Sequence, residues 1–147
     1  MASLELTIVS PEGELYSGKV DMVLAPGIDG QLGILPNHAP LITQLATGEL
    51  RVRVGGEEYY FAIHGGFMHV LPDAVTVLAD VAERAERIDI ERAEAARQRA
   101  LQMLSEAPPE ERRLTEVALR RSDVRLRVAR RRRRRVQPSY SETGESD

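Results

Sequence analysis

Hydrophobic and polar residues alternate through the first half of the chain, and this alternation predicts a series of short β-strands. Leu4, Leu6 and Ile8 are separated by polar residues, and runs of the same kind recur, between turn residues, up to about residue 80. A period of two places one side of each strand against a core. Several short strands joined by turns are typical of a sandwich or a flattened barrel, so we expect an all-β N-terminal domain.

The clearest predicted hairpin spans residues 50–63 and turns at a Gly-Gly pair. Two glycines supply the positive φ angles that a two-residue turn requires. Folding about this turn places Leu50 opposite Phe61 on one face and Arg53 opposite Glu58 on the other. Because the apolar pair and the charged pair agree with a single register, we expect that register to form.

Two other stretches interrupt the strand pattern. The segment from 31 to 43 contains Pro36 and Pro40, which exclude a helix or a central strand, so we expect an exposed loop of defined shape. A second Gly-Gly pair, Gly65-Gly66, is expected to separate the strand before it from a further strand at 67–71.

Between residues 77 and 93 the apolar repeat changes from every second residue to every third or fourth, which predicts helices. Asp89 is suited to cap a first helix, along which Ala93, Ala96 and Ala100 form a stripe of small residues. Two prolines at 108–109 end that helix and begin a second one. The second helix carries one broad stripe of Leu114, Val117, Ala118, Arg121, Val124, Arg125 and Val128. The result is an antiparallel helical hairpin, too short to be stable unless it packs on another surface.

The distribution of charge supports the same division. Residues 1–83 carry 3 basic and 11 acidic residues, whereas residues 84–135 carry 17 basic and 9 acidic residues. The last twelve residues carry three acids. The net charge of −3 therefore conceals two parts of opposite sign. We therefore expect a β-sandwich over residues 1–84 and a two-helix hairpin over residues 88–135. The tail, residues 136–147, is poor in apolar residues and is expected to be disordered.

Composition argues against several classes of function. The absence of cysteine excludes disulfides and thiolate metal sites, and no apolar run is long enough to span a membrane. Residues 13–19 fit the start of a phosphate-binding loop, but Val20 occupies the position of the magnesium-binding Ser or Thr. His38, His64 and His69 lack ligand spacing, so we expect no metal site. Without a recognisable nucleophile and base, we expect no catalytic residues.

Arginine dominates the end of the second helix. The run comprises Arg130, Arg131, Arg132, Arg133, Arg134 and Arg135. Its composition fits a polyanionic partner, such as nucleic acid, an acidic protein loop or anionic lipid. It also fits a solvated helix end whose cations offset the negative carbonyl terminus. The residues alone leave both readings open.

A second group of charges links the two helices. Asp89 and Arg92 begin the first helix on one face, and Arg121 and Arg125 lie one turn apart on the second. If the helices fold together, two or three guanidinium groups could meet a polyphosphate. The alternative is a helix cap with surface ion pairs.

Taken in order, three stretches of the chain resemble the epsilon-subunit family of bacterial F-type ATP synthases, whose chloroplast counterpart is similar. They are Gly-Gln-Leu-Gly-Ile-Leu-Pro-Asn-His-Ala-Pro-Leu at 30–41, Gly-Gly-Phe at 65–67 with Val-Thr-Val-Leu-Ala-Asp at 75–80, and Ile-Asp-Ile-Glu-Arg-Ala at 88–93. The resemblance covers residues 4–135. It implies a β-sandwich bound to the gamma subunit and to the membrane c-ring. It also implies a C-terminal hairpin that either packs on the sandwich or extends into the catalytic head and blocks hydrolysis.

The resemblance also assigns binding residues. The rotor interface is expected at Gln31, Leu32, Gly33, Pro36, His38, Pro40 and Leu41, with Gln31 standing where relatives often have an acid. ATP, as a regulatory ligand and not a required cofactor, is expected at Glu83, Ile88, Asp89, Arg92, Ala93, Arg121 and Arg125. Leu114 stands where a third arginine of the second helix can occur. The arginine run is expected to face the acidic loop of the beta subunits.

The function implied is that of a non-catalytic rotor subunit of a proton-translocating synthase, which couples c-ring rotation to ATP synthesis and restrains hydrolysis. The implied partners are gamma, the c-ring, and the beta and alpha subunits. The implied location is the cytoplasmic face of the bacterial cell membrane, reached only through the complex. The alternative is a nucleic-acid or ribosome-associated module, which the small number of aromatic residues and the acidic sandwich disfavour, so we expect no nucleic-acid partner.

Overall fold

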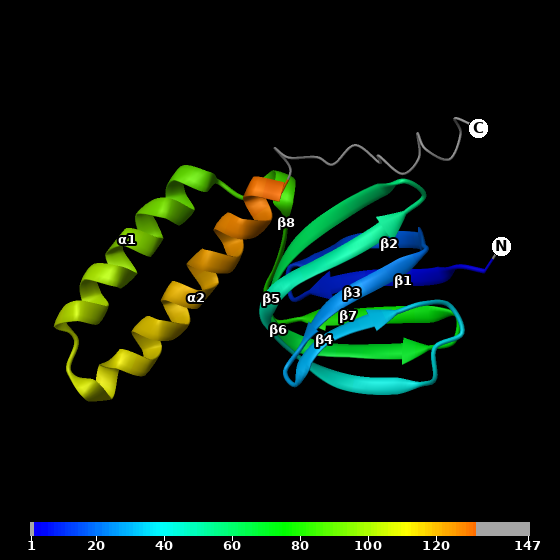
Figure 1. Cartoon of the computed structure of the whole chain (residues 1–147), viewed down its shortest axis with the longest axis horizontal. Coiled ribbons are helices and arrows are strands. Elements are labelled where there is room, and N and C mark those ends of the chain that lie inside the picture. Colours follow the sequence, from blue (N-terminus) through cyan, green and yellow to red (C-terminus); the bar gives the residue numbers. More distant parts are fainter. Residues whose placement is uncertain (1, 132–147) are drawn as a thin grey trace, which may run out of the picture.

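The computed structural model describes residues 2–131, which form a β-sandwich followed by two helices (Figure 1). The alternating pattern of the first half forms strands, and the pattern repeating every three or four residues forms helices, as predicted. The elements are β1 Leu4–Ser10, β2 Gly13–Val20, β3 Met22–Gly27, β4 Gly30–Ile34, β5 Leu41–Val54, β6 Glu57–Leu71, β7 Ala74–Ala79, β8 Ala82–Arg84, the 3₁₀ helix η1 Ala85–Arg87, α1 Ile90–Glu106 and α2 Pro109–Arg131.

The eight strands of the described residues belong to one sheet that folds into two layers. The strand order is β2-β1-β7-β6-β5-β3-β4, with β8 paired to β6. Neighbours are antiparallel except β1 and β7. In the β5–β6 hairpin Leu50 pairs with Phe61 and Arg53 with Glu58, which confirms the predicted register.

The Gly65-Gly66 pair bends a strand and does not end it. The prediction of two separate strands here is wrong, because β6 runs without a break from Glu57 to Leu71. Both glycines have positive φ, 87° and 127°. A Cβ added to Gly66 would lie 2.2 Å from the Leu78 carbonyl oxygen, so only glycine lets β6 pass this close to β7.

The expected loop at 31–43 is likewise only partly irregular. Gly30–Ile34 forms β4, which pairs with β3 and, within the described part of the chain, with no other strand. An edge strand is compatible with the prolines because both follow it. Asn37 takes a positive φ of 71° and donates its backbone N–H to the Pro72 carbonyl, which ties the loop to the turn before β7.

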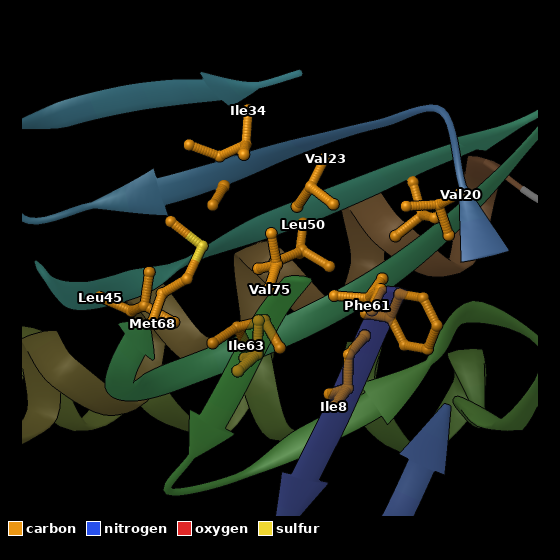
Figure 2. Close-up of a cluster of buried hydrophobic side chains, with 14 of the residues drawn as sticks. Ile8, Val20, Val23, Ile34, Leu45, Leu50, Phe61, Ile63, Met68 and Val75 are labelled. Carbon is orange, nitrogen blue, oxygen red and sulfur yellow. The ribbon is translucent and has the colours of Figure 1, made fainter. Parts of the chain in front are cut away.

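The main core lies between the two layers and is almost entirely aliphatic. Figure 2 shows side chains from several strands converging there, including Ile8, Val23, Leu50, Ile63 and Met68, each fully buried. These residues occupy the inward positions of the alternating pattern, so their burial fixes which face of each strand is outside.

Local sequence signals set where each of the two helices begins. The Asp89 side chain accepts a hydrogen bond from the Arg92 backbone N–H at 3.1 Å, which confirms Asp89 as the N-cap of α1. Pro109 begins α2, where its missing N–H costs nothing. Among residues 2–131, neither helix is long and apolar enough to cross a membrane. The expectations for residues 132–147 lie outside the described residues.

Candidate functional site

Helix α2 lies between α1 and the sandwich (Figure 1), and a small apolar cluster joins it to β6. Val124, Val128 and Ala129 of α2 pack against Tyr60 and Ala62, with Ala85 and Ile88 completing the cluster. Each fully buried valine contributes about 1.5–3 kcal/mol. Because most of the other cluster members are small, the apolar contribution to this contact is a few kcal/mol.

Only the C-terminal half of α2 makes this contact. Leu114 and Val117 are 76% and 44% exposed, so the predicted stripe is wrong in its N-terminal half. Thr115 and Ser122, which the prediction left out, are buried instead. They lie seven residues apart, two turns along one side of the helix. The tip of the hairpin therefore extends beyond the sandwich without packing on it.

An ion pair between α2 and the sandwich lies beside the apolar cluster. Arg125 donates from Nε and Nη2 to the two carboxylate oxygens of Glu83 at 2.8 and 2.9 Å, and His64 Nε2 lies 3.8 Å from Glu83 Oε1. Interactions with His64 and then with Arg125 hold the pKa of Glu83 below its ordinary value, against the opposing effect of burial. Two residues expected to bind nucleotide are thus bound to each other.

A second ion pair lies at the end of α2. Arg131 donates from Nε and Nη2 to both oxygens of Glu49 at 2.7 and 2.9 Å, while Arg130 donates to Glu94 of α1 at 3.2 Å. Hydrogen bonding with Glu49 raises the pKa of Arg131. Two members of the arginine run are therefore paired within this chain. Arg132, Arg133, Arg134 and Arg135 lie outside the described residues.

The remaining expected nucleotide residues lie along one flank of the hairpin. Glu94 and Asp123, which carry the ion pairs between α1 and α2, mark the opposite flank. Arg92 is two residues before Glu94, and Arg121 and Arg125 are two residues either side of Asp123. Two residues turn a helix by about 200°, so all three arginines point away from that bridged flank.

The structure does not bring these arginines to a single point. The pairs Arg97–Asp123 and Arg130–Glu94 set the alignment of the helices. This alignment puts Arg92 about 7 Å along the axis from the level of Arg125 and farther from Arg121. Arg92 and Arg121 are exposed, and Ile88 and Ala93 are buried. The arrangement suits an extended anion better than a single phosphate. Arg99, two turns after Arg92 on the same face, was missed and was detectable from that spacing.

An open groove lies on the other flank of the hairpin. Its volume is about 1080 Å³, and its lining includes Glu94, Arg97, Asp123, Arg127 and Arg130. Most of the charges that line it are already paired across the helices. The groove is therefore separate from the expected nucleotide residues.

The expected rotor-binding residues occupy one edge of the sandwich. Gln31, Leu32 and Gly33 lie on β4, and Pro36, His38 and Pro40 lie in the loop that leads to Leu41 of β5. His38 Nδ1 is 2.8 Å from the Ala39 carbonyl oxygen, which turns the ring back onto the loop. Leu35 is 57% exposed between them, so this edge presents apolar surface to solvent.

A second apolar patch, on the outer face of the sandwich, was missed. Phe67 pairs with Leu78, and Ile42 lies on the neighbouring strand β5. These three side chains are 52%, 53% and 69% exposed. Alternation along β6 and β7 was the available signal, because it assigns Phe67 and Leu78 to the face opposite the core. Clustered exposed apolar side chains mark an interaction surface.

Comparison with known proteins agrees with the architecture. Residues 3–85 match the family model described as the beta-sandwich domain of the ATP synthase Delta/Epsilon chain, and residues 83–130 match its long alpha-helix domain. Proteins named ATP synthase epsilon chain from Dehalococcoides mccartyi and Herpetosiphon aurantiacus are each 50% identical, over 139 and 133 residues. These alignments cover 93% and 90% of this chain and 99% and 98% of the relatives.

A solved structure shares the same arrangement. A chain in the cryo-EM structure of Euglena gracilis mitochondrial ATP synthase, containing OSCP, F1 and the c-ring in rotational state 1, is similar with a TM-score of 0.75 and 27% identity. The match covers 84% of this chain and 79% of that one. The family models match both parts of the chain, the two-layer sandwich and the capped helical pair that folds onto it. Together with the 50% identical relatives, these matches show that the chain belongs to the ATP synthase epsilon-chain family.

Proposed function

We propose that this protein is a rotor component of the ATP synthase central stalk, which couples c-ring rotation to ATP synthesis and restrains ATP hydrolysis through its C-terminal hairpin. Its partners are the gamma subunit, the c-ring, and the beta and alpha subunits. It acts at the cytoplasmic face of the bacterial cell membrane, where the complex holds it. Membership of the family supports this proposal, as does the similar solved chain, which belongs to an assembly that contains F1 and the c-ring.

The sandwich is the part that binds the rotor. Two surfaces support this assignment: the β4 edge with its loop, including Gln31 and His38, and the outer patch of Ile42, Phe67 and Leu78. The patch lies on β5, β7 and the part of β6 after the Gly65-Gly66 bend, whereas Tyr60 and Ala62, which contact α2, lie before that bend. The sandwich can therefore bind its partners without displacing the hairpin.

The hairpin is the regulatory part, and the observation that carries this proposal is how little holds it. One small apolar cluster and the pairs Glu83–Arg125 and Glu49–Arg131 attach α2 to the sandwich. Contacts worth a few kcal/mol permit two populated positions, and any ligand that favours one position shifts the balance. Extension would release Arg131 from Glu49, and the arginine run, residues 130–135, would face the acidic loop of the beta subunits.

ATP is the regulatory ligand in this proposal. Asp89, Arg92, Arg121 and Arg125 supply the binding residues, with Glu83, Ile88 and Ala93 beside them. Arg92, Arg121 and Arg125 share the flank that the interhelical ion pairs leave open. Arg125 binds the phosphate while it stays paired with Glu83, because leaving Glu83 would weaken docking. ATP would then hold the two helices together and favour the docked position.

Crosslinking in the assembled enzyme tests the regulatory role. Because the chain has no cysteine, Ala62→Cys with Val128→Cys introduces the only thiols of this subunit, within one buried cluster. We expect crosslinking to increase with ATP and to raise the hydrolysis rate, because the tethered hairpin cannot extend. The single-cysteine variants are controls. Crosslinking that ignores nucleotide, with hydrolysis unchanged, would contradict the proposal.

A further inference from the structure

The outer face of the β5–β6 hairpin carries a cluster of aromatic and charged residues to which the family function assigns no role. Glu49 and Arg51 of β5 alternate with core residues, so both face outward, as does Tyr60 of β6, which pairs with Arg51. Tyr60 is 8% exposed and the Glu49 side chain is 9% exposed. An aromatic ring and a carboxylate so nearly buried on an outer face require a partner that covers them.

The end of α2 provides that partner. The Arg131 guanidinium places two nitrogens on the two oxygens of Glu49, and its central carbon lies 5.2 Å from the centre of the Tyr60 ring. A planar cation is thus bound in two ways, by a bidentate carboxylate and by an aromatic ring within the range of a cation–π interaction.

The rest of the cluster holds this arrangement in place. Arg51 lies 5.5 Å from the same ring centre and 3.8 Å from Glu49, and the Tyr60 hydroxyl donates to Glu58. Burial and this hydrogen bond raise the pKa of Tyr60 to about 12, so the hydroxyl remains protonated and keeps donating. Glu49 is fixed by the fold, because its neighbour Leu50 is fully buried in the core.

We infer that Glu49 and Tyr60 form a binding site for a guanidinium group on the sandwich, selective for arginine over lysine, which Arg131 occupies when the hairpin is docked. Lysine has a single point charge and cannot make both contacts at once. When the hairpin leaves, the 3.8 Å contact with Arg51 is the one that Glu49 keeps among residues 2–131, so the site is open.

The regulatory role of this site rests on the proposed function, in which the hairpin moves between two positions. Arg131 belongs to the arginine run that would face the acidic loop of the beta subunits in the extended position. The same side chain then has two acidic partners, Glu49 in one position of the hairpin and the beta subunit in the other. The more tightly the sandwich site holds Arg131, the smaller the fraction of molecules in which the arginine run is available to the beta subunit.

Docking of the hairpin in the isolated full-length protein provides the test. Labels on Asp29→Cys and Glu116→Cys, both exposed positions in a chain without cysteine, report docking by energy transfer. We expect Arg131→Lys to weaken docking about tenfold, nearly as much as Arg131→Gln, because lysine loses the bidentate and ring contacts. Arg130→Lys is the matched control and should change docking little, because Arg130 pairs with exposed Glu94 on α1.

A double-mutant cycle identifies the partner. If Arg131 acts through Glu49, then Glu49→Gln combined with Arg131→Lys should weaken docking no more than either change alone. Circular dichroism confirms that each variant keeps its fold. Full docking in Arg131→Lys, or additive effects in the cycle, would overturn the inference. Since this measurement contains no ATP, beta subunit or c-ring, its failure leaves the proposed function to be decided by the crosslinking experiment.

Discussion

Glu83, in the last strand of the sandwich, accepts two hydrogen bonds from the guanidinium of Arg125 in α2, at 2.8 and 2.9 Å. Forty-two positions separate the two residues in the chain, so this pair exists only while the hairpin is docked. About a quarter of each side chain is exposed, which makes the pair stronger than a surface ion pair and easier to open than a buried one.

Replacing Arg125 with glutamine should therefore weaken docking. We expect a loss of about 1–2 kcal/mol, since two charge-assisted hydrogen bonds disappear at a partly exposed site. Energy transfer between the labelled sandwich and hairpin measures it. Arg120→Gln provides the control, because Arg120 is exposed in the same helix. Equal effects of the two substitutions would show that the Glu83 pair contributes nothing specific.

Docking should also depend on pH in a defined direction. The pKa of Glu83 lies below its ordinary value of 4.5 in the docked chain, chiefly because of His64 and Arg125. His64 belongs to the sandwich, so only the part of the shift caused by Arg125 depends on docking. This part stabilises the docked position above pH 4.5 and is lost as the pH falls below 4.5 through the docked-state pKa. The wild type should undock progressively in that window, as followed by energy transfer. Glu83→Gln should show a flatter profile there, and a parallel profile would refute the assignment.

Nucleotide affinity should depend on one flank of the hairpin. Arg92→Ala and Arg121→Ala should each weaken ATP binding to the free protein about tenfold, because each removes a guanidinium from the proposed anion site. Isothermal titration calorimetry gives the affinity. Arg127→Ala is matched in chemistry but lies on the groove side, so it should leave affinity unchanged. Unaltered binding in Arg92→Ala would remove that residue from the site.

Gly66 should tolerate no side chain. In Gly66→Ala the new Cβ would meet the Leu78 carbonyl at 2.2 Å, and φ would remain at 127°. We expect a loss of about 3 kcal/mol or more in the free energy of unfolding, measured by urea titration. Gly13→Ala, which has the same φ but no atom within 4 Å of the new Cβ, should cost only about 1 kcal/mol. Similar losses would mean that close approach of β6 and β7 is unimportant.

The outer patch should matter for assembly and not for folding. Phe67→Ser removes a ring that is 52% exposed, so the thermal midpoint should change little while the affinity for the gamma subunit falls about tenfold or more. Co-purification with gamma and titration of the isolated subunits measure this. Met103→Ser, at a 59% exposed position of the hairpin, should have no such effect. Normal gamma binding by Phe67→Ser would place the interface elsewhere.

Local patterns in the sequence predicted the elements wherever one physical rule dominated. Alternation placed Leu50 and Phe61 in one core, and the capping preference of aspartate placed the start of α1 at Asp89. The same rules failed where a distant neighbour decided the outcome. Gly65-Gly66 reads locally as a break, yet the approach of β7 makes it a bend inside one strand.

The sequence predicted the residues of the candidate site but not the contacts between them. The spacing of Asp89, Arg92, Arg121 and Arg125 follows from helical periodicity, and a helix wheel would also have found Arg99. Periodicity does not state that Glu83 is bound to Arg125, nor that α1 and α2 are aligned so that Arg92 lies far from Arg121 along the axis. Those relations depend on how the hairpin docks.

By itself, the sequence determined the class of fold, the division into an acidic sandwich and a basic hairpin, and the family. It could do so because the hydrophobic period, the turn residues and the order of motifs can all be read from residues close together in the chain. Only the tertiary structure decided which side chains hold the hairpin. Arg131 is 82 positions from Glu49 and shares no sequence pattern with Glu49 or Tyr60. Their association follows from the register of β5 and β6 and from the face of α2 that packs on them, so it required the three-dimensional arrangement.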